Sequence, residues 1–283
     1  MQDRLGTTRV IDDLIEMRGL RFHYRDWQAQ CENAPTLVLL HGFSGHARSW
    51  DFFAETATDR FRVLALDQRG HGETDWSTDA SYGVLEMKED LVCFVRALGL
   101  DNYYLVGLSM GGMVAMNFAG DCPVGLQKLV IVDIAPEIGS VGARAIQERV
   151  RQSDEFDSVE QAFERARAAN PIPPDDVYFH RVRHSLMRTE NGKWTYRYDR
   201  AYRTPGDAPR RRPSAEEGWQ AVARISVPTM LVRGEHSPLL TREIADKFVG
   251  VAEDCTFVEI PGSGHSVPLD KPKEFGDAVL SFL

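Results

Sequence analysis

The chain has 283 residues, 43% of them hydrophobic, with 33 Lys and Arg against 42 Asp and Glu for a net charge of -9. This length can bury a large core, and one α/β domain with an inserted cap accounts for it without a second domain. No Lys/Arg-rich run is long enough to bind a phosphate backbone, so a nucleic-acid partner is not expected.

The N-terminus is charged and lacks the apolar core of a signal peptide, and no later apolar run approaches the ~20 residues of a membrane-spanning helix. We therefore expect a cytoplasmic protein without membrane contact. The cysteines show neither CxxC nor metal-type spacing, which is typical of reduced packing residues. They are Cys31, Cys93, Cys122 and Cys255.

Apolar runs rich in β-branched residues alternate with helical patterns along most of the chain. This alternation predicts an α/β fold with a mostly parallel, doubly wound sheet. The predicted strands are 20–24, 36–40, 62–66, 103–107, 128–132, 229–232 and 256–260. The predicted helices are 85–98, 110–119, 242–249 and 273–283.

The alternation stops between Ala135 and about Pro213, where the sequence becomes helical, charged and interrupted by Pro171 to Pro174 and by Pro205-Gly206. Such a length without a core strand is too long for a plain loop. We expect a helical cap over residues 136–213, inserted into a core formed by residues 1–135 and 214–283.

Gly107-Leu108-Ser109-Met110-Gly111 follows the apolar run YYLVG and opens a helical pattern. This is a G-x-S-x-G sequence in the strand-turn-helix context of a nucleophilic serine. The flanking glycines permit a tight turn, and the helix N-terminus behind Ser109 offers N–H groups to a developing oxyanion. The motif predicts that Ser109 is a nucleophile.

Three more motifs accompany this turn, and the four together resemble the α/β-hydrolase superfamily over nearly the whole chain. The pattern is most similar to the small esterases, lactonases and carbon-carbon bond hydrolases of that superfamily. The three are His41-Gly42-Phe43, Asp67-Gln68-Arg69-Gly70-His71-Gly72 and Gly262-Ser263-Gly264-His265.

The resemblance implies an oxyanion hole formed by the backbone N–H groups of Phe43 and Met110. It also implies that His265, on a loop after the run TFVEI, is the general base. An imidazole titrates near neutrality, so His265 can accept the serine proton and return it to a leaving group.

The carboxylate that orients this base is harder to assign. Most superfamily members carry it after the penultimate strand, but here Ser237 and Pro238 occupy that position. Asp133, at the end of the preceding strand, would emerge at the same sheet edge as Ser109, and we expect it to be the acid. Glu235 is an alternative acid, and Asp133 could also serve only to cap a turn.

The cap is the basic part of an acidic chain, with 15 Lys and Arg against 11 Asp and Glu between residues 141 and 213. Most of these charges are typical of a solvated helix surface, although a cap arginine could pair with a substrate carboxylate. The candidates are Arg181, Arg183, Arg188, Arg197, Arg200 and Arg203.

These observations predict hydrolysis of a small carboxylic ester or lactone through an acyl-enzyme on Ser109, without metal or cofactor. Two alternatives stay open. The basic cap favours cleavage of a carbon-carbon or amide bond in a carboxylate-bearing metabolite, and the missing acid after Gly234 favours a ligand-binding protein without turnover. The sequence does not predict the oligomeric state.

Overall fold

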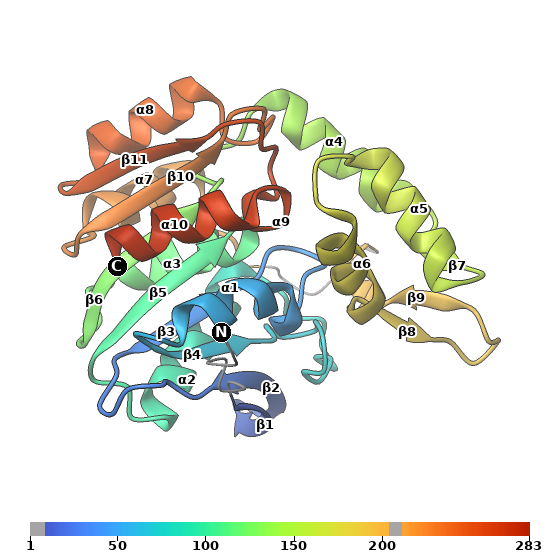
Figure 1. The fold of residues 1–283 in the computed structure, drawn as a ribbon. Helices are drawn as coiled ribbons and strands as arrows, with labels where there is room; N and C mark the ends of the chain where they lie inside the picture. Colours follow the sequence, from blue (N-terminus) through green and yellow to red (C-terminus); the bar gives the residue numbers. More distant parts are fainter. Residues whose placement is uncertain (1–8, 204–210) are drawn as a thin grey trace, which may run out of the picture.

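An eight-stranded sheet forms the centre of the computed structural model, which describes residues 9–203 and 211–283 (Figure 1). The strand order is β1-β2-β4-β3-β5-β6-β10-β11, in which β2 pairs antiparallel with both β1 and β4 and all other neighbours pair in parallel. The strands are β1 (Val10–Met17), β2 (Leu20–Trp27), β3 (Thr36–Leu40), β4 (Arg62–Leu66), β5 (Tyr103–Leu108), β6 (Leu126–Val132), β10 (Thr229–Gly234) and β11 (Cys255–Ile260).

Helices cover both faces of this sheet, which confirms the doubly wound α/β class. Helices α1 and α10 pack on one apolar cluster, and α2, α3, α7 and α8 pack on another across the sheet. The helices of the core are α1 (Asp51–Ala57), α2 (Val84–Ala97), α3 (Met110–Ala119), α7 (Ala215–Ala223), α8 (Arg242–Val251), α9 (Val267–Asp270) and α10 (Pro272–Phe282), with the short 3-10 helix η1 (Ala47–Trp50).

The chain from α4 to η2 (residues 140–202) lies beside the core in Figure 1 and adds no strand to the large sheet over its described residues, whereas α7, which follows it, packs on the core. The apolar cluster of this segment includes Phe156, Tyr178 and Val182. Pro205-Gly206 lies outside the described residues. The elements of this cap are α4 (Ser140–Arg151), β7 (Glu155–Phe156), α5 (Val159–Ala169), α6 (Asp175–His184), β8 (Leu186–Arg188), β9 (Trp194–Tyr196) and η2 (Arg200–Tyr202).

The cap is not purely helical, because β7, β9 and β8 form a three-stranded antiparallel sheet. The turn between β8 and β9 contains Asn191-Gly192, and Gly192 has a φ of 80°. An Asn-Gly pair that reaches positive φ is a strong hairpin signal, and the Trp-Thr-Tyr run of β9 has high strand propensity.

The parallel strands place their following loops at one edge of the sheet, as expected for a ligand site in this kind of fold. Ser109 follows β5, Asp133 follows β6, and His265 lies in the loop after β11. No helix in the described part of the chain is long and apolar enough to cross a membrane.

Candidate active site

Ser109 sits in a strained turn between β5 and α3. Its φ and ψ of 53° and -113° lie outside the usual regions for a side-chain-bearing residue. The turn depends on glycines, because a Cβ at Gly107 would lie 2.4 Å from the Gly111 carbonyl oxygen and one at Gly111 would lie 2.4 Å from the Leu40 carbonyl oxygen. The sequence thus folds here into a turn that projects the serine from the sheet edge.

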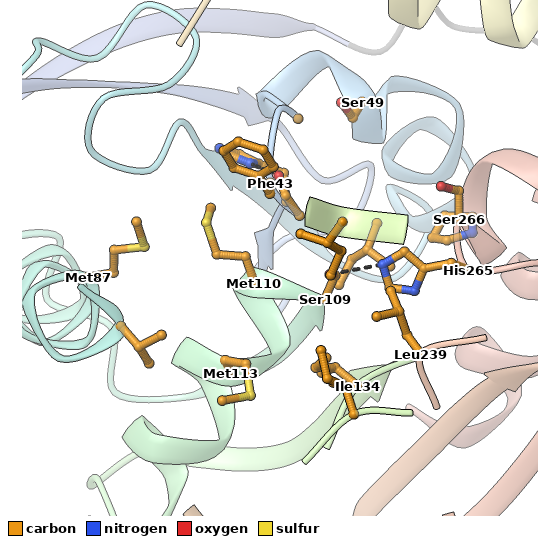
Figure 2. Close-up of a pocket in the computed structure, with 18 of the residues that line it drawn as sticks. Phe43, Ser49, Met87, Ser109, Met110, Met113, Ile134, Leu239, His265 and Ser266 are labelled. Atoms are coloured by element: carbon orange, nitrogen blue, oxygen red, sulfur yellow. Dashed lines mark hydrogen bonds between the residues drawn. The ribbon is translucent and has the colours of Figure 1, made fainter. Parts of the chain in front are cut away.

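His265 bridges Ser109 and Asp133, so the structure brings together the three side chains that the sequence grouped. Its Nε2 lies 3.0 Å from the Ser109 Oγ (Figure 2), and its Nδ1 lies 2.7 Å from the Asp133 Oδ2. Asp133 is fully buried, whereas the His265 side chain is 27% exposed. With Nδ1–H donating to the carboxylate, Nε2 is left as the acceptor that faces the serine hydroxyl.

The Asp133 carboxylate has two further donors, both from the loop after β10. Gly234 N–H donates to Oδ1 at 2.9 Å, and the Ser237 hydroxyl donates to Oδ2. Ser237 is buried, and its oxygen accepts weaker bonds from the N–H groups of Leu239 and Leu240. The sequence indicated only that Ser237 stands where most superfamily members carry the acid, and it did not predict this contact.

Glu235 contacts the backbone of the histidine loop instead of the imidazole. Its Oε2 accepts from Gly262 N–H at 2.7 Å, three residues before His265. The carboxylate is exposed and also lies 3.8 Å from the His236 Nε2. The alternative acid therefore fastens the loop that carries the candidate base.

The backbone N–H groups of Phe43 and Met110 come from two segments that meet at Ser109 (Figure 2). Met110 is the first residue of α3, so its N–H has no acceptor within the helix. A Cβ on Gly42 would lie 3.2 Å from the Ser109 Cβ, which shows how closely the loop that begins with His41 and Gly42 passes the serine. This arrangement can offer two N–H groups to a developing oxyanion.

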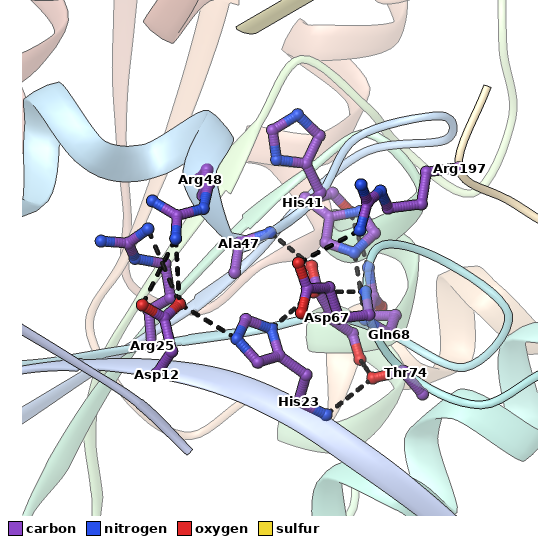
Figure 3. A network of polar contacts seen from close by, with 12 residues as sticks. Asp12, His23, Arg25, His41, Ala47, Arg48, Asp67, Gln68, Thr74 and Arg197 are labelled. Carbon is purple, nitrogen blue, oxygen red and sulfur yellow. Dashed lines mark hydrogen bonds and ion pairs between the residues drawn. The ribbon is translucent and has the colours of Figure 1, made fainter. Parts of the chain in front are cut away.

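Asp67 anchors the loop of residues 41–47, which follows β3 and contains His41 and Gly42, through a buried polar network (Figure 3). Its carboxylate accepts from Ala47 N–H at 2.5 Å and Glu73 N–H at 2.9 Å, and it lies 2.7 Å from His23 Nδ1. Burial opposes ionisation, but the His23 hydrogen bond and neighbouring histidines hold the pKa of Asp67 at about 2. Asp67 is therefore an ionised anchor at neutral pH.

His41 fixes the same loop through both ring nitrogens. Gln68 N–H donates to Nε2 at 3.0 Å, so Nδ1 carries the proton and donates to the Gly42 carbonyl at 2.9 Å. Burial lowers the pKa of His41, which keeps the ring neutral. These bonds set the direction of the backbone just before Phe43.

A cavity of about 460 Å³ opens around Ser109, a size suited to a small organic ligand. Its described wall is mainly apolar and contains no Asp or Glu. Across the described chain, no group of three or more His, Cys, Asp or Glu is arranged to hold a metal ion. Wall residues from the core and cap include Phe43, Trp50, Tyr82, Met87, Met110, Met113, Ile134, Ile146, Arg181, Tyr202, Arg212 and Leu239.

Of the six cap arginines considered from the sequence, Arg181 alone is among the described wall residues. Arg183 is exposed. Four more contact cap or core groups away from that wall: Arg188 the Gly192 carbonyl and the Trp194 ring, Arg197 the Glu73 carboxylate, Arg200 the Glu155 carboxylate, and Arg203 the Asp154 carboxylate.

Comparison with known proteins identifies the class. A family model described as the alpha/beta hydrolase fold matches residues 35–272, and the chain therefore belongs to that family and is a hydrolase of this fold. It is 30% identical over 258 residues to esterase Rv0045c of Mycobacterium tuberculosis, covering 89% of this chain and 83% of that protein.

Two other relatives span nearly the whole chain. The 3-hydroxybutyrate-oligomer hydrolase of Cupriavidus necator is 26% identical over 290 residues, covering 99% of this chain and 97% of that protein. The crystal structure of E-2-(acetamidomethylene)succinate hydrolase superposes with a TM-score of 0.85 at 22% identity, covering 97% of this chain and 99% of that one, and this likeness concerns the fold.

Proposed function

We propose that this protein is a serine hydrolase that cleaves a small carboxylic ester or lactone through an acyl-enzyme on Ser109. The hydrogen-bonded series Ser109–His265–Asp133 at the floor of a mainly apolar cavity carries this proposal. The names of the two curated relatives, an esterase and a 3-hydroxybutyrate-oligomer hydrolase, support it.

The first half of the reaction acylates the enzyme. The Ser109 oxygen attacks the substrate carbonyl carbon while His265 Nε2 takes the hydroxyl proton, and the N–H groups of Phe43 and Met110 stabilise the oxyanion. The carbon–oxygen bond to the leaving group then breaks as His265 returns the proton to that oxygen. Asp133 stabilises the imidazolium and holds its orientation.

The second half releases the acid. His265 takes a proton from a water molecule, the resulting hydroxide attacks the ester carbonyl on Ser109, and collapse of the intermediate returns the proton to the serine oxygen. This cycle needs no metal or cofactor. The unpaired state of all four cysteines supports a reducing, cytoplasmic location, which we propose on that ground and on the sequence.

The test is hydrolysis of short p-nitrophenyl esters and simple lactones by the wild type and Ser109→Ala, together with labelling by a fluorophosphonate probe. We expect turnover and labelling that both disappear in the variant. A wild type that takes the label without ester turnover would favour the second candidate, cleavage of a carbon-carbon or amide bond in a carboxylate-bearing metabolite, which Arg181 in the cavity wall also favours. A protein that refuses the label would be a binding protein.

A further inference from the structure

The cavity has two chemically different ends on either side of Ser109. Figure 2 shows Met87, Met110 and Met113 on one side of the serine and His265 on the other. All of these residues line the cavity. Methionine side chains are flexible and apolar and suit a hydrocarbon group of variable shape. A second arginine, Arg212, also lines the cavity, and it follows Arg211, whose carbonyl accepts from Leu85 N–H at the start of the helix that carries Met87.

Arg181 lies at the His265 end. A small second pocket is bounded by Arg181 together with Ser49, Pro268 and Leu269, and all four residues also line the main cavity. Pro268 and Leu269 belong to α9, which begins two residues after His265. The arginine and the candidate base therefore border the same part of the cavity.

The backbone of Arg181 is tied to the core beside the oxyanion loop. His46 Nε2 donates to the Arg181 carbonyl at 3.1 Å. Burial, assisted by the positive charge of Arg181, lowers the pKa of His46 to about 3, and the same charge contributes to the lowered pKa of His41. The guanidinium thus acts electrostatically on the loop that leads to Phe43.

A buried tryptophan next to Ser49 has a side-chain donor that lacks an acceptor among the described residues. Trp50 follows Ser49, lines the cavity and is 1% exposed, and its Nε1–H has no hydrogen-bond acceptor in the described structure. Leaving a buried donor unpaired is costly. This nitrogen is itself buried, so a ligand in the cavity reaches it only if the side chains around it move.

The chemistry of acyl transfer assigns the two ends to the two halves of a substrate. His265 must return its proton to the leaving oxygen, so the leaving group lies on the His265 side and the acyl group lies on the other side. We propose that Arg181 is a specificity-determining residue that pairs with a carboxylate on the leaving-group half of the substrate. This inference rests on the proposed ester hydrolysis.

The experiment compares matched esters that differ in one charge. The leaving-group pair is 4-butyryloxybenzoate and its neutral analogue 4-butyryloxybenzamide. The acyl pair is the 4-nitrophenyl monoester of glutarate and 4-nitrophenyl pentanoate. We expect wild-type kcat/KM to favour the carboxylate in the first pair by about 10- to 100-fold, as one charge-assisted contact implies, and to favour it less in the second.

Variants at and near Arg181 assign the preference. Arg181→Gln should reduce the preference ratio of the first pair to near one, mainly through KM, and Arg181→Lys should retain part of it because the charge remains without the planar fork. Arg183→Gln removes an exposed arginine of the same helix and should leave the ratio at its wild-type value. Thermal unfolding of each variant checks that the cap stays folded.

Binding to Ser109→Ala, measured by calorimetry with the same benzoate and benzamide esters, separates this inference from the proposed function. Tighter binding of the benzoate that is lost with Arg181→Gln supports the carboxylate site even if the wild type hydrolyses neither ester. The absence of hydrolysis would then count against the proposed ester hydrolysis but not against the carboxylate site. Equal binding of the two esters, a preference that survives Arg181→Gln, or a larger preference in the acyl pair would overturn the inference.

Discussion

The Ser237 hydroxyl donates to the same Asp133 oxygen that lies 2.7 Å from the His265 imidazole. A serine on the loop after β10 therefore supports a carboxylate supplied by β6. We predict that Ser237→Ala lowers kcat by about 10-fold with little change in KM, because the carboxylate loses a charge-assisted bond that helps to orient it. Steady-state kinetics on a p-nitrophenyl ester checks this, with Ser281→Ala, an exposed change on α10, as the control. A larger effect on KM than on kcat would contradict it.

Asp133→Asn and Glu235→Gln separate the two acid assignments. An amide at position 133 cannot stabilise the imidazolium as a carboxylate does and favours the wrong tautomer of His265, so we expect kcat to fall by about 10³- to 10⁴-fold with the fold retained. Glu235→Gln should retain most turnover, because the Glu235 carboxylate contacts the Gly262 N–H and lies near the His236 ring, not the His265 imidazole. Circular dichroism and kcat of both variants give the answer, and equal losses would defeat the assignment to Asp133.

Much of the fold was predictable because the sequences of buried parallel strands are apolar and rich in β-branched residues. All seven predicted strands are confirmed, and the predicted helix 110–119 coincides with α3. β1 was missed because this edge strand is mostly exposed and contains Asp12, Asp13 and Glu16, so it has no apolar run. The hairpin of β8 and β9 was also missed, although Asn191-Gly192 was a local signal for it.

The contacts of the site were less predictable than its residue types. The sequence could place Ser109, Asp133 and His265 at strand ends, because parallel strands share one edge. It could not show that Ser237 turns toward Asp133, since that depends on the path of a loop. It also could not choose Arg181 among the cap arginines, because the choice depends on how α6 docks on the core.

Asp270 connects the candidate base loop to the cap. It is 2% exposed, its Oδ2 accepts from Gly264 N–H at 2.8 Å, and its Oδ1 accepts from the Asn170 amide at 2.8 Å. We predict that Asp270→Asn lowers kcat several-fold and costs about 1–3 kcal/mol of unfolding free energy, because one buried donor loses its acceptor. Kinetics and urea unfolding measure both effects.

The control for this change is Asp277→Asn, which alters an exposed carboxylate paired with Lys273 on α10 and should have little effect on either quantity. Asn170→Ala removes only the cap side of the connection, so it should be milder than Asp270→Asn in its effect on kcat. Unchanged kcat in Asp270→Asn would show that the loop holds His265 without this carboxylate.

Stability should fall in mild acid because of buried histidines. Burial lowers the pKa of His46 and of His71 to about 3, from an ordinary value of 6.5. Below about pH 6.5 the unfolded chain binds protons at these rings while the folded chain does not. The contribution of the two neutral rings to the free energy of unfolding is therefore complete above that pH. It is lost as the pH falls toward 3, by up to about 1.4 kcal/mol per pH unit for each ring.

His71→Phe isolates one of these rings. His71 packs among the rings of Phe43, Tyr198 and Tyr202, where a phenyl ring can keep the aromatic contacts. The variant loses the bond from Nδ1–H to the Arg69 carbonyl, so the slope of stability against pH is the informative quantity rather than stability itself. Urea unfolding between pH 7 and 4.5 should give a slope that is shallower by an amount that grows as the pH falls and approaches about 1.4 kcal/mol per pH unit below about pH 5.5. An unaltered slope would mean that His71 takes up a proton equally in both states, contrary to its burial.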